Sequence, residues 1–492
     1  MLSVYQHWDP LKVCLVGRSY PPEFYSFIEN PKVRSVMERI AIETEEDYQK
    51  LITLLEKFKV KVIRTDISDN FDVYFDEKSR KYYPPPMCPR DYTGMFGNRF
   101  FVPDKDYGNL MKLYEQSLEN KDFTNDDFLQ ALCCFNIRDK VQSFGCDEDI
   151  LVFLLEYYAT LKSNSMSHCT TNTNFDPFKT VKEFVLSCDN ELVLENGVNT
   201  AVTTRIGKDL IFGGVHPKGG LNHCLSIIKK YFKDYRCHII REVCGHTDAS
   251  FCPVKPGLVV SLNKPYRHEK TFPEWEVVSL KNQSWHKVKP FLDLKKKNKG
   301  KWWVPGEEYN NDFTDFVESW LNDWVYYVEE TVFDVNILVI DENNVVCNNY
   351  NKDVFDAFER HNITAHIINF RHRYFWDGGL HCITSDLDRE GIQKNYFPEK
   401  NKQIYLYGES YADIMNKYKK DLQNYKNRIN IVWFYQILCS RLEQTNSGRL
   451  LGWIVLNIVF RNHILKDILT NYPISLIVEG FVMKNGPIVL KN

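Results

Sequence analysis

A cysteine that follows two glycines and a histidine is the strongest candidate for chemistry in this sequence. Residues 376–382 read WDGGLHC, so Cys382 opens a strand-like run that continues through Ile383–Thr384. Glycine lets the backbone take φ above zero and lets a ligand approach closely, which predicts a thiol presented in a cleft. A nearby positive group or a bound cationic substrate would favour the reactive thiolate. Alone, one cysteine among 14 is more often a core residue.

A histidine and an aspartate upstream are candidates to serve that thiol. His246 and Asp248 are two residues apart, so on a strand both side chains would point to one face. A base that protonates a leaving amine would then lie beside a carboxylate that grips a cation. The pattern also fits a hydrogen-bonded core pair. A metal site that adds Cys244 and Cys252 is disfavoured, because Cys252 falls just before a proline turn, and no metal is expected.

A second carboxylate follows a triple proline. Asp91 closes the segment Pro89–Arg90–Asp91, which precedes an aromatic strand over 93–102. By itself Asp91 is a turn or surface residue. Combined with Asp248 it forms a second clamp for a guanidinium, whose planar fork fits carboxylates. These residues together suggest a cysteine enzyme that acts on a cationic substrate.

The elements that must position these residues repeat a strand–helix–strand unit. In the first unit, Thr44 and Asp47 resemble a capping box, which predicts that the helix begins at Thr44. Apolar residues at helical spacing follow. Such repetition is typical of a pseudo-symmetric α/β fold. The three predicted units are 12–16, a helix from 44 and 60–63; then 210–212, 221–232 and 238–240; then 335–340, 354–361 and 366–370.

Two regions depart from this repeat. Residues from about 108 to 190 are helical and polar, and predict an insertion into a main domain of residues 1–400. Residues 401–492 predict a helical C-terminal extension, with helices over 411–425, 429–442 and 450–465.

Composition narrows the class of protein. The net charge of −3 gives no reason to expect nucleic acid as a partner. No CxxC pair occurs and the N-terminus lacks a signal-peptide pattern, so the cysteines are expected to be reduced thiols in the cytoplasm. The most apolar run, Leu450–Phe460, is shorter than the roughly 20 residues that cross a bilayer, so no membrane partner is expected.

The same segments, in the same order, resemble the amidinotransferases, the glycine amidinotransferase branch of the guanidine-modifying (pentein) superfamily. The resemblance covers most of residues 1 to about 395 apart from the insertion, and it does not cover the last ~95 residues. The matching segments are Trp8–Leu11, Val16–Arg18, Pro89–Asp91, Arg205–Leu210, Tyr235–Ile240, His246–Phe251, Gly257–Ser261, Asn336–Glu342 and Gly378–Cys382.

This resemblance implies a five-fold pseudo-symmetric α/β propeller of ββαβ units, with the active site in its central channel. Cys382 would be the nucleophile and His246 the general acid and base. Asp91 and Asp248 would clamp a guanidinium. The implied reaction has two stages: Cys382 takes the amidino group from a donor such as arginine, and an acceptor amine then opens the S-amidino enzyme.

Two positions depart from the family pattern. The acid that orients the histidine aligns with Asn199 without a gap, or with Glu195 after a small insertion, so both are candidates. The acceptor-side serine falls near Glu330, which leaves the acceptor amine open. Arg90, Arg267 and Glu330 are further candidates for substrate contact.

Three functions are consistent with this pattern. The first is an amidinotransferase with arginine as donor, an amine as acceptor and no cofactor. The second is a deiminase-type arginine or guanidine hydrolase of the same fold. The third is a binding protein without turnover, suggested by the missing acid at Asn199 and by the added segments. The sequence leaves a homodimer open.

Overall fold

Five small sheets, each with a helix, build the part of the protein that the computed structural model describes. All strands and helices below lie within that part. The described residues are 1–76, 80–103, 175–195, 198–213, 220–240, 246–262, 267–280, 302–321, 324–325 and 334–417.

One pattern recurs in these sheets: an antiparallel strand pair, then a helix, then a third strand parallel to the second. A parallel connection needs a crossover, and a helix is its usual form. The units are β17 (Thr384–Arg389), β1 (Leu11–Val16), α1 (Pro31–Lys57) and β2 (Lys61–Arg64); β5 (Gly94–Phe96), β6 (Arg99–Val102), α6 (Lys179–Ser187) and β7 (Glu191–Leu194); β8 (Thr203–Ile206), β9 (Asp209–Phe212), α7 (Gly220–Tyr231) and β10 (Arg236–Ile239); β11 (Phe251–Lys255), β12 (Leu258–Ser261), α8 (His268–Thr271) and β13 (Glu276–Ser279); and β14 (Leu338–Asp341), β15 (Asn344–Cys347), α11 (Lys352–Arg360) and β16 (Thr364–Ile367).

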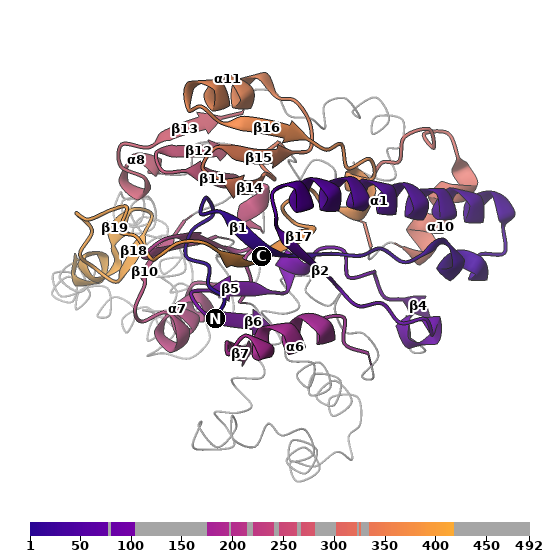
Figure 1. Ribbon diagram of the computed structural model, residues 1–492, viewed down its shortest axis with the longest axis horizontal. Coiled ribbons are helices and arrows are strands. Elements are labelled where there is room, and N and C mark those ends of the chain that lie inside the picture. The colour runs from indigo at the N-terminus through magenta and orange to yellow at the C-terminus, as the bar shows by residue number, and fades with distance from the viewer. Residues whose placement is uncertain are drawn as a thin grey trace, which may run out of the picture.

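The first unit joins the two ends of this repeat. Its first strand, β17, comes from the end of the series and pairs antiparallel with β1, placing Asp386 opposite Cys14. Figure 1 shows β1, β5 and β17 toward the middle of the molecule and α1, α6, α7 and α11 toward its rim. The segment just before β17, which carries Cys382, therefore enters the centre of the described fold.

The three predicted strand–helix–strand units are confirmed, and the bounds of their strands and of the second and third helices are shifted by at most three residues. The predicted start of the first helix is wrong. Helix α1 begins at Pro31, and the side chain of Asn30 caps it by accepting a hydrogen bond from the Lys32 N–H. Thr44 is a buried mid-helix residue whose Oγ1 accepts a hydrogen bond from Trp376 Nε1 at 2.9 Å. A tertiary partner, rather than a helix end, explains this threonine.

The two regions predicted to lie outside the repeat are only partly described. Residues 108–174 of the expected insertion lie outside the described part, whereas α6, which it included, belongs to the second unit together with β7. After residue 400, β18 (Ile404–Leu406) and β19 (Glu409–Ser410) extend the third sheet, and 411–417 is helical. The remaining predicted C-terminal helices lie outside the described residues.

Short elements connect these units. They include helix α10 (Asn311–Trp320), helix α12 (Arg373–Trp376), the hairpin β3 (Phe75–Asp76) and β4 (Lys81–Tyr82), and the 3₁₀ turns η1 (Pro22–Phe27), η2 (Phe71–Tyr74), η3 (Pro89–Asp91) and η5 (Thr247–Ala249). Among the helices in the described residues, none is long and apolar enough to cross a membrane.

Candidate active site

Cys382 lies in a turn two residues before β17, where its side chain is buried. The glycines in front of it do not take φ above zero, and Asp377 takes that conformation instead, with φ 51°. Gly378 is needed for a close approach, because a Cβ atom there would lie 2.8 Å from Cys88 Sγ. The turn therefore packs the thiol into the protein, which corrects the prediction of an open presentation based on glycine flexibility.

Asn336, in the segment leading into β14, organises this turn. Its Oδ1 accepts hydrogen bonds from the His381 N–H at 2.8 Å and the Cys382 N–H at 3.2 Å. Its Nδ2 donates to Cys382 Sγ at 3.0 Å. Asn348 supports the arrangement by donating to the backbone carbonyl of Asn336 and accepting from the Leu380 N–H. Four hydrogen bonds that join Asn336 and Asn348 to residues 380–382 thus hold the nucleophile candidate in one position.

Asp248 contacts the thiol directly. It lies in η5, so the predicted strand with His246 and Asp248 on one face is wrong. Its Oδ2 accepts from Cys382 Sγ at 3.4 Å and lies 2.9 Å from His381 Nδ1. Because a carboxylate only accepts, His381 carries its proton on Nδ1 in this contact. The turn redirects Asp248 inward and leaves His246 on the outer side.

His246 lies beside Asp91 rather than beside Asp248 in a shared strand. Its Nδ1 is 3.8 Å from Asp91 Oδ1, and its side chain is 41% exposed, compared with 23% for Asp91. A half-exposed imidazole can exchange protons with solvent and with a substrate that enters from that side. This position suits a group that moves protons, whereas Asp91 and Asp248 lie deeper.

The two candidate clamps have carboxylate oxygens that are free within the described part of the chain. Asp91 Oδ1 and Asp248 Oδ1 are buried and accept no hydrogen bond from any described residue. Burial raises the pKa of Asp91 to about 7, although Arg90 opposes the shift. Burial, and to a lesser degree the charge of Asp91, raises the pKa of Asp248 to about 6 despite the opposing charge of His246. A cation between these carboxylates would favour their ionised forms.

The thiol is poorly ionised in this setting. Burial, followed by the charges of Asp248 and Asp91, holds the pKa of Cys382 well above its usual range. The neighbouring imidazole supplies no positive charge, because burial and the charge of Arg90 hold the pKa of His381 well below its usual range. His7 stacks on His381 with ring centroids 5.6 Å apart. A bound cation would therefore supply the positive charge that the thiolate needs.

Arg90 is buried and serves the turn rather than an open cleft. Its Nε donates to the carbonyl oxygens of His381 and Thr384, each at 2.8 Å. Its Nη2 lies 3.1 Å from Asp386 Oδ1. The expected contact between Arg90 and substrate is corrected accordingly: with its side chain fully buried, Arg90 braces the Cys382 turn against η3.

The other predicted site residues lie elsewhere. Glu195 accepts hydrogen bonds from Lys230 and from the Tyr231 hydroxyl. Asn199 Oδ1 accepts from the N–H groups of residues 201 and 202, each at 3.1 Å. Among the described residues, neither contacts His246. Arg267 pairs with Glu409 at 2.6 Å and is corrected from a site residue to a surface one.

Two further predicted residues lie outside the part of the chain that the structure describes. Glu330, the remaining substrate candidate, lies outside it. Cys244, considered for a metal site, also lies outside it. Among the described residues, no three His, Cys, Asp or Glu side chains are placed to hold a metal ion.

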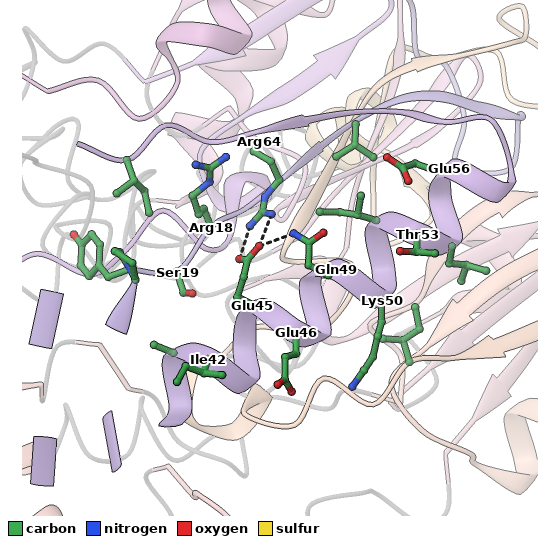
Figure 2. Close-up of a pocket in the computed structure, with 18 of the residues that line it drawn as sticks. Arg18, Ser19, Ile42, Glu45, Glu46, Gln49, Lys50, Thr53, Glu56 and Arg64 are labelled. Atoms are coloured by element: carbon green, nitrogen blue, oxygen red, sulfur yellow. Dashed lines mark hydrogen bonds and ion pairs between the residues drawn. The ribbon is translucent and has the colours of Figure 1, made fainter. Parts of the chain in front are cut away.

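A groove of about 1550 Å³ runs along the exposed side of α1 and is lined by α1, β2 and residues 366–368, but by none of the predicted site residues among those described. Figure 2 shows Arg64 paired with Glu45 and Arg18 beside it. Side chains of both charges line this groove. We place the candidate chemistry at Cys382, where the candidate nucleophile lies beside the Asp248 carboxylate, and not in this groove.

Glycine amidinotransferases are among the curated proteins that this chain is similar to, whereas no protein-family model matches it. The mitochondrial glycine amidinotransferase of Xenopus tropicalis is 28% identical over 167 residues, which are 33% of this chain and 32% of that protein. Its Gallus gallus counterpart is 27% identical over 168 residues. The chain resembles the glycine amidinotransferases. The match spans about a third of the length of these relatives, and it confirms the expected resemblance.

Solved amidinotransferases align over most of this amidinotransferase-like chain. SxtG, an amidinotransferase from Microseira wollei in the saxitoxin biosynthetic pathway, has a TM-score of 0.48 at 14% identity, covering 80% of this chain and 99% of SxtG. The inosamine-phosphate amidinotransferase StrB1 from Streptomyces griseus has a TM-score of 0.44 at 17% identity, with the same coverage. A dimethylarginine dimethylaminohydrolase has a TM-score of 0.38 at 9% identity, covering 76% of this chain and 99% of that chain.

Sequence reasoning missed Asn336 as a site residue. The signal was present, because this amide precedes the apolar run of β14 and a buried amide needs partners. It also missed Asp386 and two of its three arginine partners, Arg205 and Arg389. Arg389 lies on the same strand as Asp386, whereas Arg90 on η3 and Arg205 on β8 come from distant segments, so only the tertiary structure brings those two to Asp386.

Proposed function

We propose that this protein is an amidinotransferase that moves the amidino group of arginine to an acceptor amine through an S-amidino intermediate on Cys382. The observation that carries the proposal is the pair of buried, free carboxylate oxygens of Asp91 and Asp248 beside a buried thiol. Likeness to the glycine amidinotransferases supports the same chemistry.

Binding of the donor would use the two carboxylates. A guanidinium presents N–H groups in a planar fork and stays charged in proteins, so it can satisfy both free oxygens at once. The buried carboxylates would then ionise in the complex. This pairing selects a planar cation over a neutral amide, because a neutral ligand would leave the buried charges uncompensated.

The same cation would activate the nucleophile. In the free protein, the Cys382 S–H donates to Asp248 Oδ2, and nearby carboxylates disfavour the thiolate. A bound guanidinium offsets these negative charges, so the thiol releases its proton to solvent as the donor binds. The reactive thiolate then forms only when its target is in place.

The first half-reaction forms a C–S bond between Cys382 and the amidino carbon. The carbon becomes tetrahedral, the C–N bond to ornithine breaks, and the protonated imidazole of His246 gives its proton to the departing amine. The products are ornithine, neutral His246 and a cationic S-amidino-cysteine. The half-exposed position of His246 beside Asp91 is consistent with this proton transfer.

The second half-reaction reverses these steps with a new amine. The acceptor nitrogen attacks the amidino carbon, neutral His246 removes one proton from that nitrogen, and the C–S bond breaks to release the thiolate. The product is a new guanidinium compound, and the enzyme returns to its starting protonation. The acceptor stays open, because Glu330 on the expected acceptor side is outside the described residues.

Mass spectrometry of the quenched protein tests the proposal. After incubation with arginine carrying a labelled guanidino carbon, the peptide that contains Cys382 should gain an amidino group alone, and free ornithine should appear. Cys382→Ala should lack the adduct. A wild-type peptide without any adduct would favour the binding protein without turnover.

The adduct also separates transfer from hydrolysis. A deiminase-type hydrolase expels ammonia first, so its adduct retains the ornithine chain, and water then opens it to citrulline. Citrulline as the sole product would therefore replace the proposed transferase by the hydrolase. With an amine panel present, a new guanidino compound would identify the acceptor class.

We also propose that the five units close into a five-fold pseudo-symmetric propeller over residues 1–400. Pairing of β17 with β1 supports closure of the repeat. The cytoplasmic location and a homodimer remain proposals, and so does a helical C-terminal extension, which would begin at residue 411 rather than 401 because β18 and β19 extend the third sheet. Import into isolated mitochondria would test location, because the curated relatives named above are mitochondrial by name.

A further inference from the structure

We propose that the Asn336 side-chain amide stabilises the thiolate of Cys382 and holds its sulfur in place for attack. The proposal rests on the proposed function only for the role of Cys382 as nucleophile. It begins from the 3.0 Å contact between Asn336 Nδ2 and Cys382 Sγ, both of which are buried. An amide N–H aimed at sulfur donates more strongly when the sulfur becomes negative.

The orientation of this amide is set by its other partners. Two backbone N–H groups, those of His381 and Cys382, point to one end of the Asn336 side chain. Only an oxygen can accept them, so the NH₂ group must occupy the other end. There it faces Cys382 Sγ and the carbonyl oxygen of Asp248, at 3.0 and 3.3 Å. A flipped amide would place two donors against two donors.

This donor offsets an otherwise unfavourable environment. The thiol is buried, and its S–H donates a hydrogen bond to the Asp248 carboxylate. The imidazole of His381 turns its Nδ1 to Asp248 rather than to the sulfur. Among the described residues, Asn336 therefore provides the side-chain N–H that contacts the sulfur. Its backbone hydrogen bonds make this donor rigid, so no reorganisation is needed when the thiolate forms.

Alkylation of Cys382 by iodoacetamide measures thiolate formation without any substrate. Rates at Cys382 would be read by peptide mass spectrometry across pH 7–10.5 in wild type, Asn336→Asp and Asn336→Ala. Asn336→Asp keeps an oxygen for the two backbone N–H groups but removes the donor and adds a negative charge. Loss of a hydrogen bond to a charged group raises the pKa of the thiol by about 1 to 2 units. The pH at which alkylation accelerates should therefore be higher by that amount in Asn336→Asp than in wild type.

The expected rate at pH 8.5 falls about tenfold or more in Asn336→Asp, with a smaller fall in Asn336→Ala. Asn190→Asp is the matched control, because Asn190 is also a buried amide bonded to backbone groups but has the N-terminal segment as its partner. Alkylation should be unchanged there. Equal profiles in wild type and both Asn336 variants would overturn the proposal.

Circular dichroism of each variant distinguishes a loss of folding from a change in thiolate formation. If Asn336→Asp does not fold, the profile of Asn336→Ala decides, since it removes the donor without adding charge. Arginine adduct formation is scored independently. A wild type without an adduct but with the Asn336-dependent shift would refute the proposed function and leave the inference about the amide standing.

Discussion

Two clusters of charged and polar side chains lie next to each other around β17. They differ in how many of their carboxylate oxygens accept hydrogen bonds. In the first, which we call the Asp386 cluster (Asp386, Arg90, Arg205 and Arg389), both carboxylate oxygens accept from guanidinium groups at 2.7 to 3.1 Å. In the second, the Cys382 cluster (Cys382, Asp91, Asp248 and His246), two carboxylate oxygens remain free among the described residues.

The same chemical group therefore behaves oppositely in neighbouring places. Burial alone would raise the pKa of Asp386, but Arg205, Arg389 and Arg90 together hold it well below its usual range. Burial raises the pKa of Asp91 to about 7, because Arg90 only partly offsets it. A saturated carboxylate stabilises a fold, whereas an unsaturated one can bind a cation.

The largest effect is expected from breaking the saturated cluster. Asp386→Asn would leave three buried guanidiniums without their counter-charge, and loss of one partner from a buried ion network destabilises by about 3 to 5 kcal/mol. Urea unfolding followed by circular dichroism measures the change. Asp248→Asn is the matched variant from the open cluster, and we expect it to cause no loss of stability above pH 7, because it removes a buried ionised carboxylate whose raised pKa opposes folding.

Equal losses of stability in these two variants would contradict the distinction between the clusters. The comparison must be made at one pH above 7. There the buried carboxylate of Asp248 is ionised, and because its pKa is raised to about 6 its ionisation opposes folding.

Removing the proton carrier should affect turnover and spare the fold. His246→Ala is expected to lower kcat by about 10²- to 10⁴-fold, the usual range for loss of a general acid and base. Arginine-dependent formation of ornithine measures it. His361→Ala, which removes a histidine paired with Glu276 outside both clusters, is the control and should retain activity. Normal turnover in His246→Ala would reject the proposed mechanism.

A neutral clamp should weaken donor binding. Asp91→Asn replaces a charge-assisted contact with the guanidinium by a neutral one, which corresponds to a rise in KM for arginine of about 10- to 100-fold. Asp356→Asn, at a surface pair with Lys352, serves as control. An unchanged KM in Asp91→Asn would remove Asp91 from the site and would leave Asp248 as the sole clamp.

The smallest effect concerns pH. Because the pKa of Asp91 is raised to about 7, this group is mostly protonated at pH 6 in the free protein and ionised at pH 8. A cation binds the ionised form, so KM for arginine should fall about tenfold from pH 6 to pH 8. Asp91→Asn should flatten this slope. A KM that rises with pH would show that the open cluster does not bind a cation.

Much of the fold was predictable because its signals are local. The strands at Leu11–Val16 and Leu338–Asp341 are apolar runs, and α11 has apolar residues at helical spacing. The start of α1 was not predicted, because a buried threonine bonded to Trp376 resembled a cap. Where a local pattern fits two structures, as a threonine fits both a helix cap and a buried mid-helix position, the tertiary contacts determine which one forms.

The site was predictable only in part for the same reason. The types of Cys382, Asp91 and Asp248 indicated a thiol with carboxylate clamps for a cation, and the structure places Asp248 beside the sulfur. The orienting roles of Glu195 and Asn199 depended on chain position alone. Their side chains found nearer partners on α7 and in a backbone turn.

The sequence by itself determined the repeated strand–helix–strand unit and indicated the chemistry that we propose, since periodicity and residue type are local properties. Only the tertiary structure decided which carboxylates are free and which are saturated. Asp386 and Asp248 look alike in the sequence, yet two arginines from distant segments and one from its own strand reach Asp386, whereas a thiol reaches Asp248. Ionisation in a protein interior depends on the charges within a few ångströms, and long-range closure of the chain sets those distances.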